Sequence, residues 1–385
     1  MKILHVCEYV RGGIATYLNE ILKYQATTEQ VSSVHVLMSE YNSDKLVING
    51  VHVDYYHYKR KLSKFIPAII QINRAIKKIH PDIIHIHSSF AGLFVRVCFF
   101  FKRKRPKIVY CAHGWSFLME ISRYKKKMYG ILERVLARKT DRIINISDHE
   151  FIGSLKYKIP KEKSLVIPNG IEDRLYINKD VALALDPSKL NLLFVGRFDR
   201  QKGIDILLNF FKNDPLKHVR LYTIGGNVLD PVLKKIPDTI ISLGWIDHNV
   251  IDSYYEKFDA VIIPSRWEGF GLVAIEAMKN RKAVIASNRG DLPDLVKDGV
   301  NGYLFDLNHL EELTRILTTV SKQELEAMGE RGFAIFQEKY TGEKLNQRLM
   351  DVYQQLVEGH GSQRSIEQVH SMRQSNVKNR RNRYL

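Results

Sequence analysis

Residues 264–272 read Pro-Ser-Arg-Trp-Glu-Gly-Phe-Gly-Leu, and this stretch decides which fold the chain adopts. It follows an apolar run, Ala260–Ile263, that predicts a buried strand, and it leads into a helical pattern over Gly271–Lys279. A strand, a short loop and a helix in this order form one unit of a parallel α/β sheet. Glycines in such a loop let backbone amides approach an anion, and the positive end of the helix dipole attracts it. We therefore expect this loop to accept a diphosphate.

Short apolar strands alternate with longer helices in both halves of the chain, as expected for a parallel sheet in each half. The expected strands are Lys2–Val6, Val34–Leu37, Ile83–His87, Ile108–Cys111 and Arg142–Ile146, then Leu190–Gly196, Val219–Ile224, Thr239–Leu243, Ala260–Ile263 and Ala283–Ala286. The expected helices are Gly13–Ala26, Phe65–His80 and Met128–Lys139, then Asp205–Phe211, Val250–Lys257, Gly271–Lys279 and Leu310–Leu317. This pattern predicts an α/β fold of two Rossmann-like domains that face each other across a cleft.

The boundaries of these domains follow from the turn signals. We place an N-terminal domain at residues 1–170 and a C-terminal domain at residues 171–340, because Pro168-Asn169-Gly170 is a turn-forming tripeptide after a strand. Residues 341–358 carry apolar side chains at helical spacing. Residues 359–385 are polar and basic, and we expect this tail to be disordered.

The composition restricts the class of protein. The chain has 385 residues, 45% of them apolar and 26% charged, which is ordinary for a globular protein of about two domains. Three cysteines without a CxxC pair indicate free thiols in a reducing compartment. The N-terminus is too polar for a signal peptide and no apolar run reaches the ~20 residues of a membrane span, so we expect a cytoplasmic protein. His85 and His87 share one face of a strand, but without a third ligand nearby they do not predict a metal site.

Four charged residues of the second half stand where ligands bind in a parallel sheet. Arg197 follows an expected strand and Lys202 comes five residues later, so both lie at the carboxyl edge of the sheet, although two solvated basic residues explain this pair equally well. Glu268 and Glu276 are too far apart to be neighbours on one helix face, and they can therefore serve different parts of one ligand. The structural alternatives are a surface acid at 268 and a glutamate favoured by the helix dipole at 276.

Several motifs occur in a specific order along the chain. Val-Gly-Arg-Phe-x-x-x-Lys-Gly spans 195–203, Leu-Gly-Trp spans 243–245, and Pro-Ser-x-x-Glu-Gly-Phe-Gly-Leu-x-x-x-Glu spans 264–276. Gly-Gly-Ile at 12–14, His-Gly at 113–114, Pro-Asn-Gly-Ile at 168–171 and the stretch 290–302 complete the pattern. The combination resembles glycosyltransferase family 4, whose members have the GT-B fold, over roughly residues 1–357. Glu172 and Asp294 depart from the pattern only in the length of an acidic side chain.

The resemblance implies a role for each matching residue. Arg197 and Lys202 would bind the donor diphosphate and neutralise it as it leaves. Glu276 would hold the ribose hydroxyls, Glu268 would contact the transferred sugar, and His113 would lie near that sugar. The remaining donor contacts would come from Gly13 beside the diphosphate, from the backbone near Trp245 and Ile246 at the base, and from the loop residues Gly269, Phe270, Gly271 and Leu272. The final helix would cross back onto the N-terminal domain.

The implied reaction is transfer of a sugar, with retention of anomeric configuration, from a nucleotide-sugar to a saccharide or lipid-linked acceptor. We expect a UDP-sugar donor and a role in bacterial surface or capsular polysaccharide synthesis, the latter by fold-level analogy. The expected catalytic residues are His113, Glu268, Arg197 and Lys202. Because two cations and a helix start already face the leaving diphosphate, we expect neither a metal nor a cofactor. Without the carboxylate pair of retaining glycosidases, front-side attack assisted by the leaving phosphate is expected, with His113 positioning substrate or serving only as a loop residue.

Charge is distributed unevenly along the chain. Residues 1–170 carry a net charge of +16, residues 171–358 one of −4 and residues 359–385 one of +5. Aromatic and basic residues are mixed in 55–65 and 99–105, and Lys125–Lys127 add further charge. This mixture suits an anionic membrane surface and would also suit nucleic acid. The resemblance favours peripheral docking on the inner face of the plasma membrane, since many members of the family extend lipid-linked sugars. The alternatives are a solvated basic face and, less well supported, a nucleic-acid surface, and we expect no nucleic-acid partner.

Other functions fit the sequence less well. A GT-B enzyme such as a nucleotide-sugar epimerase would lack the block from Glu268 to Glu276, and a phosphorylase would need a cofactor pocket that the sequence does not indicate. A non-catalytic sugar-nucleotide-binding or nucleic-acid-binding protein is the alternative from another class. It predicts no donor hydrolysis and no effect of Glu268→Ala.

Overall fold

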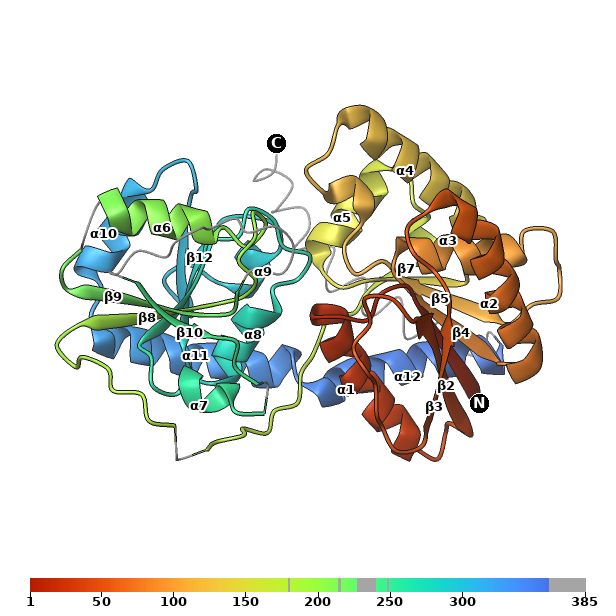
Figure 1. Ribbon diagram of the computed structural model, residues 1–385, viewed down its shortest axis with the longest axis horizontal. Coiled ribbons are helices and arrows are strands. Elements are labelled where there is room, and N and C mark those ends of the chain that lie inside the picture. Colours follow the sequence, from red (N-terminus) through yellow and green to blue (C-terminus); the bar gives the residue numbers. More distant parts are fainter. Residues whose placement is uncertain (179–180, 214–215, 227–239, 248, 360–385) are drawn as a thin grey trace.

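The computed structural model describes residues 1–178, 181–213, 216–226, 240–247 and 249–359. Within these residues the chain forms two parallel sheets, one in each half, with helices on both faces of each (Figure 1). The predicted α/β fold of two Rossmann-like domains is confirmed.

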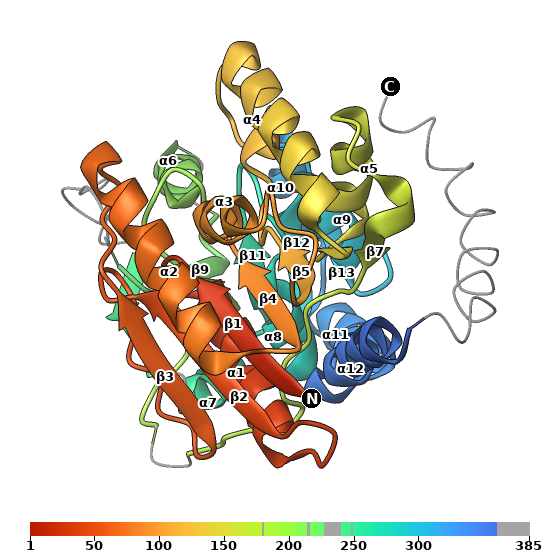
Figure 2. The ribbon, with the colours of Figure 1, turned by 90° about the vertical axis from the view of Figure 1, so that its right-hand side faces the viewer.

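The N-terminal sheet contains seven of the described strands. They are β1 (Lys2–Cys7), β2 (Ser33–Ser39), β3 (Val51–Tyr56), β4 (Ile83–His87), β5 (Lys107–Cys111), β6 (Arg142–Asn145) and β7 (Ser164–Val166), in the order β3-β2-β1-β4-β5-β6-β7. The helices are α1 (Gly13–Thr27), α2 (Phe65–Ile79), α3 (Ser89–Cys98), α4 (Arg123–Leu136) and α5 (Asp148–Lys156). Helices α2, α3 and α4 lie side by side on one face of this sheet (Figure 2).

The C-terminal sheet contains six described strands. They are β8 (Leu190–Val195), β9 (Val219–Ile224), β10 (Ile240–Gly244), β11 (Ala260–Ile263), β12 (Ala283–Ser287) and β13 (Gly302–Phe305), in the order β10-β9-β8-β11-β12-β13. The helices are α6 (Ile204–Asn213), α7 (Ile251–Tyr255), α8 (Leu272–Lys279), α9 (Leu292–Leu295), α10 (Glu311–Thr319) and α11 (Lys322–Lys339). Both strand orders are doubly wound, so ligands are expected beyond the carboxyl ends of the strands.

The central strands are buried on both faces, which explains their continuous apolar sequences. Every residue of β4 and of β11 is buried. The predicted bounds of β4, β9 and β11 agree with the structure residue for residue. Strand β3 was missed because it lies at the edge of the sheet and alternates Val-His-Val-Asp with half-exposed side chains.

The last described helix, α12 (Gly342–Glu358), belongs spatially to the N-terminal domain (Figure 1). It packs against α1, and its apolar residues Leu345, Leu349, Val352, Tyr353 and Leu356 are buried. The tail predicted to be disordered lies, from residue 360 onward, outside the described residues. So does Thr239, the first residue of one expected strand.

The chain passes between the domains twice, and the two passages run side by side. Ile171 forms an isolated parallel bridge with Thr341, through Ile171 N–H to the Tyr340 carbonyl (3.0 Å) and Gly342 N–H to the Ile171 carbonyl (2.7 Å). A Cβ on Gly170 would lie 2.3 Å from the Thr341 carbonyl oxygen, so glycine is required for this close approach.

None of the described helices combines the length and apolar character that crossing a bilayer requires.

Candidate active site

The two cations expected at the end of β8 are held differently. The Arg197 side chain is 43% exposed; its Nη2 forms an ion pair with Asp199 Oδ2 at 3.0 Å and donates to Gln201 Oε1 at 3.2 Å. The Lys202 side chain is only 18% exposed, and its Nζ lies 2.5 Å from Glu268 Oε1. Sequence spacing therefore placed both residues at the same sheet edge, but Lys202 is the one fixed by a buried partner.

Close backbone packing brings the loop with Lys202 against the end of β11. Gly203 has a φ of +70°, and a Cβ there would lie 2.0 Å from the carbonyl oxygen of Pro264. The Lys202 N–H also donates to Asp199 Oδ1 at 2.9 Å, which turns the chain into α6. Only glycine fits at 203, so this residue sets the distance between Lys202 and the loop 264–271.

Glu268 accepts from two side chains at once. In addition to Lys202, the Ser265 hydroxyl donates to Glu268 Oε1 at 2.7 Å, and the Glu268 side chain is only 6% exposed. The Ser287 hydroxyl in turn donates to the Ser265 carbonyl at 2.6 Å. A charge-assisted contact of this kind orients the ammonium group firmly, so Glu268 acts at least as a support for Lys202.

The loop ends at Gly271, where α8 begins. Gly271 has a φ of +94°, which favours glycine, and Phe270 before it is buried. The amides of Phe270, Gly271 and Leu272 therefore lie at the positive end of α8, as an anion site requires.

Glu276, expected at the ribose, and Trp245 and Ile246, expected at the nucleotide base, lie outside the loop 264–271. Glu276, in the second turn of α8, accepts from the Tyr255 hydroxyl at 2.9 Å and is half-buried. Trp245 follows β10, is 62% exposed and packs against Gly226, whose Cβ would lie 2.8 Å from Trp245 Nε1. Ile246 beside it is half-buried. Within the described residues, no hydrogen bond joins Glu276 or Trp245 to Lys202.

The N-terminal domain contributes two glycine-containing turns that reach the same loop. Gly13 opens α1, and a Cβ there would lie 3.2 Å from Cδ1 of Leu272. The backbone of His113 and Gly114, after β5, lies 3.7–3.9 Å from the position of a Cβ on Gly269. Thus the carboxyl edges of both sheets meet at residues 269–272.

A hollow is lined by residues of both domains. Glu120 of the N-terminal domain and Arg200, Arg266 and Arg289 of the C-terminal domain line it. Arg200 Nη2 and Glu120 Oε2 pair across it at 3.4 Å. The hollow agrees with the predicted cleft between two domains.

His113 has an uncommon backbone conformation and is half-buried. Its φ is +51°, uncommon for a residue with a side chain, and the Tyr17 ring packs edge-on at 4.6 Å between centroids. Burial lowers the pKa of His113 to about 3, so the ring is neutral. Glu150 supports the same turn: burial raises its pKa to about 7, while hydrogen bonds from the amides of Ile146, Gly114 and Trp115 act in the opposite direction.

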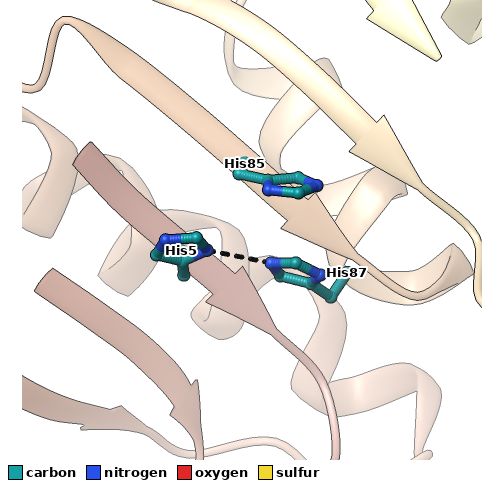
Figure 3. Close-up of side chains that lie close together, drawn as sticks. All are labelled: His5, His85 and His87. Atoms are coloured by element: carbon teal, nitrogen blue, oxygen red, sulfur yellow. Dashed lines mark hydrogen bonds between the residues drawn. The ribbon is translucent and has the colours of Figure 1, made fainter. Parts of the chain in front are cut away.

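One exclusion made from the sequence rested on a wrong premise. His85 and His87 do have a third histidine nearby, because β1 pairs with β4 and places His5 opposite His85 (Figure 3). One nitrogen from each of the three rings lies within 4.8 Å of the others, and all three residues are buried. The absence of a third ligand is therefore no argument against a metal here.

Sequence reasoning also missed several residues that support the site. Gln201 joins Arg197 to the loop, because its Nε2 donates to the Trp267 carbonyl at 3.2 Å. Ser265 was quoted only as part of a motif, and Tyr17 carried no signal beyond its helical spacing. The contacts of Gln201 with Trp267 and of Tyr17 with His113 join residues 66 or more positions apart in the sequence, which spacing alone does not reveal.

Two Rossmann-like domains that meet through the carboxyl edges of their sheets define the GT-B class. The family models agree: the one for Glycosyltransferase Family 4 matches residues 11–175, and the one for Glycosyl transferases group 1 matches residues 178–334. The chain belongs to glycosyltransferase family 4 and is a glycosyltransferase of GT-B fold.

Individual relatives are consistent with this assignment. An "Uncharacterized 41.2 kDa protein in cps region" of Klebsiella pneumoniae is 34% identical over 82% of this chain and 89% of its own length. The UDP-Gal:alpha-D-GlcNAc-diphosphoundecaprenol alpha-1,3-galactosyltransferase of Escherichia coli is 28% identical over 68% of this chain and 71% of its own. The structure of sucrose-phosphate synthase from Thermosynechococcus elongatus superposes with a TM-score of 0.77 at 21% identity, covering 92% of this chain and 99% of that one.

Proposed function

We propose that this glycosyltransferase moves a sugar from a nucleotide-sugar, preferably a UDP-sugar, with retention of configuration. The observation that carries the proposal is the buried Lys202–Glu268 pair beside the start of α8. A buried ammonium and a row of backbone amides form a site for a dianionic diphosphate. The relative from Escherichia coli, which is named for UDP-Gal as its donor, supports the choice of uridine.

The catalytic contribution of this site is electrostatic. When the bond from sugar to diphosphate breaks, negative charge grows on the leaving group. Lys202, Arg197 and the positive end of α8 stabilise that charge, so the proposed reaction has no metal-dependent step. Half-exposed Arg197 exchanges its contact with Asp199 for the diphosphate.

Retention is proposed to proceed by front-side attack. A double displacement needs a free carboxylate as nucleophile. Glu268 is paired with Lys202 and also accepts from Ser265, and a neutralised carboxylate is a poor nucleophile. The leaving diphosphate is then the base that receives the acceptor's proton, while Glu276 holds the ribose and His113 positions the transferred sugar.

We propose a lipid-linked saccharide as the acceptor, in the synthesis of a bacterial surface or capsular polysaccharide. Two relatives support this: one is named for a cps region, and the other acts on a diphosphoundecaprenol-linked sugar. An acceptor with such a lipid is confined to a membrane, so the enzyme has to work at its surface, on the cytoplasmic side where nucleotide-sugars are made.

Helix α2 carries an apolar stripe suited to that surface. Leu62, in the 3₁₀ turn Leu62–Lys64 before the helix, is 87% exposed, and Ile66 and Ile70 follow at four-residue spacing, also exposed. Lys61 and Lys64 flank the stripe and are exposed as well. Apolar side chains that enter the headgroup region beside lysines are the pattern of an interfacial helix.

Helix α4 repeats the pattern on the same face of the sheet (Figure 2). Tyr124 is 79% exposed, and Met128, Ile131 and Leu132 are exposed on the same side of the helix. Phe101 is also exposed, whereas Phe99 is buried in the core, so 99–105 contributes only in part to this surface. We propose that α2 and α4 dock together on anionic lipid.

A screen of nucleotide-sugars tests the donor assignment. Thermal shift and donor hydrolysis are measured with UDP-, GDP- and ADP-sugars, on the natural protein and on Lys202→Ala. We expect stabilisation and slow hydrolysis with a UDP-sugar, both lost in the variant. Binding without hydrolysis or transfer would support the non-catalytic alternative, and interconversion of the donor sugar without acceptor would identify an epimerase.

A further inference from the structure

An unbroken chain of hydrogen bonds leads from helix α1 to His113. The ring of His5, on β1, lies with Nε2 2.7 Å from Gln25 Oε1. Its Nδ1 lies 3.0 Å from Nε2 of His87, on β4 (Figure 3). His87 Nδ1 in turn lies 2.9 Å from His113 Nε2. Gln25, His5 and His87 are all buried, whereas His113 is half-buried at the domain interface.

All three rings are neutral. Burial lowers the pKa of His5 to about 4 and that of His113 to about 3. Burial also lowers the pKa of His87, and the neighbouring histidines add to the effect. A neutral imidazole carries one N–H, so a ring that donates from one nitrogen must accept at the other.

We propose that Gln25, which lies at the far end of this chain from the domain interface, fixes which nitrogen of His113 carries the proton. The Gln25 oxygen only accepts, so His5 donates to it from Nε2 and accepts at Nδ1. His87 then donates to His5 and accepts at its own Nδ1. His113 therefore donates from Nε2 to His87, and its Nδ1 keeps a lone pair.

The orientation of the Gln25 amide determines this direction. The Gln25 oxygen faces His5 and lies 2.7 Å from its Nε2. The Gln25 nitrogen is buried, and within the described residues it has no hydrogen-bond partner. The orientation in which the Gln25 oxygen accepts from His5 therefore sets the direction of the chain.

The consequence concerns the substrate, and it rests on the proposed function. With Nδ1 unprotonated, His113 accepts a hydrogen bond from a sugar hydroxyl and cannot donate one. The opposite tautomer would present an N–H and favour a carbonyl or phosphate oxygen instead. Gln25 and His5 are thus positioning residues for the glycosyl-transfer site, although neither reaches it.

A metal ion at His5, His85 and His87 is the competing interpretation of the same cluster. A bound metal needs the lone pair of each ligating nitrogen. His5 Nδ1 and His87 Nε2 are hydrogen-bonded to one another, so one of them carries a proton between the rings. Metal binding and the hydrogen-bond chain therefore exclude each other, and we favour the chain because it satisfies both nitrogens of His5 and of His87.

The tautomer of His113 is measured by NMR on protein with ¹⁵N-labelled histidine rings. We expect a pyridine-type Nδ1 and a pyrrole-type Nε2 for His113 in the natural protein, with the signals assigned by a His113→Asn variant. Gln25→Met, which keeps size but removes the acceptor, is expected to give a mixture of tautomers. Gln25→Glu, which keeps an accepting oxygen, is expected to restore the natural one.

Tyr17→Phe is the matched control, because Tyr17 touches the His113 ring but lies outside the chain. It should leave the tautomer unchanged. An Nδ1–H tautomer in the natural protein, or an unaltered tautomer in Gln25→Met, would overturn the proposal, as would stoichiometric zinc binding abolished by His5→Asn. In transfer assays we expect Gln25→Met to lower kcat roughly tenfold, the scale of one lost hydrogen bond. Since the NMR result needs no substrate, failure of the proposed function would show only in the activity assay.

Discussion

Lys202 is the cation with the firmest position in the site, since Glu268 holds its ammonium group and Gly203 fixes its backbone. We expect Lys202→Ala to lower turnover by at least ~100-fold, the usual scale for losing one group that stabilises transition-state charge. Arg197→Ala should have an effect of the same order. Steady-state kinetics with the donor found in the screen measures both.

Arg200→Ala is the matched control for these variants. Arg200 lies in the same loop, is largely exposed and pairs with Glu120. Its loss should leave turnover within a few-fold of the natural enzyme. Near-natural turnover in Lys202→Ala would remove the diphosphate assignment.

Glu150 makes stability depend on pH. Its pKa is raised to about 7 in the folded protein, above its ordinary value of 4.5, because burial disfavours the charged form. Folding is therefore favoured by this group below pH 4.5, and the contribution is lost as the pH rises through about 7. The loss amounts to about 3 kcal/mol of unfolding free energy. Glu150→Gln, which stays neutral, should flatten this part of the pH profile in urea unfolding between pH 5 and pH 8.

An exposed carboxylate provides the comparison. Glu120→Gln, in the same domain but more than half exposed, should leave the profile of the natural protein unchanged. Identical profiles for Glu150→Gln and the natural protein would show that Glu150 is ionised in the fold at all these pH values.

For single residues, the sequence indicated which side chains belong to the candidate site, but it did not show most of the residues they contact. Lys202 and Glu268 could be selected because each stands beside a glycine after a strand. Their ion pair could not, because 66 positions separate them. His5 could have been found: a doubly wound order makes the first and fourth strands neighbours, and the alternation of strand side chains puts His5, His85 and His87 on one face. The premise that no third histidine lies near His85 and His87 was wrong, because distance was judged along the chain and not across the sheet.

Among the helices and strands, α2 gives the most specific prediction, which concerns binding to a membrane. The natural protein should sediment with vesicles of anionic lipid at low salt, and binding should weaken as salt screens the lysines. Leu62→Ser with Ile66→Ser should lower the partition coefficient at least ~10-fold, because burying one such side chain contributes about 1.5–3 kcal/mol.

Val47→Ser is the control for a change of exposed apolar surface, since Val47 is exposed in the N-terminal domain but lies outside α2 and α4. It should bind vesicles as the natural protein does. Neutral phosphatidylcholine vesicles should bind all variants weakly. No sedimentation with anionic vesicles at low salt would rule out membrane docking by this face.

The spacing of apolar residues predicted a helix or strand well where the same faces of that element are buried along its whole length. Strand β11 is buried on both faces and α12 is apolar on one, and both patterns were read correctly. The bounds of α4 were wrong by a turn and more because its first residues are basic and its apolar side is partly exposed. Helix α3 is absent from the predicted helices, because ten residues that pack against both a sheet and a neighbouring helix show little periodicity.

In the whole molecule, α12 makes the N-terminal domain discontinuous in sequence. Residues 360–385 are polar and basic and offer few apolar side chains to bury, so we expect a chain that ends at residue 359 to keep its melting temperature. Ending the chain at residue 341 uncovers α1 and removes the hydrogen bond between Tyr353 and His85 Nδ1 (2.6 Å). We expect that truncated chain to lose cooperative unfolding of its N-terminal domain.

Thermal unfolding followed by circular dichroism, together with limited proteolysis of the products, distinguishes the two truncations. A protease-resistant N-terminal fragment from the chain that ends at 341 would show that α12 is dispensable for the domain. Equal loss of stability in both truncations would instead give residues 360–385 a structural role.

The same helix imposes an order on how a newly made chain matures. The ribosome completes the seven strands of the first domain by residue 166, but the helix that covers them follows only at residues 342–358. At about 5–20 residues per second, roughly ten seconds or more of synthesis separates the two events. During that interval the first domain emerges with the apolar side of α1 uncovered, while the second domain can already fold. A nascent chain therefore exposes the apolar side of α1 until α12 has left the ribosome. We expect chaperones that bind at the ribosome to cover this surface during that interval.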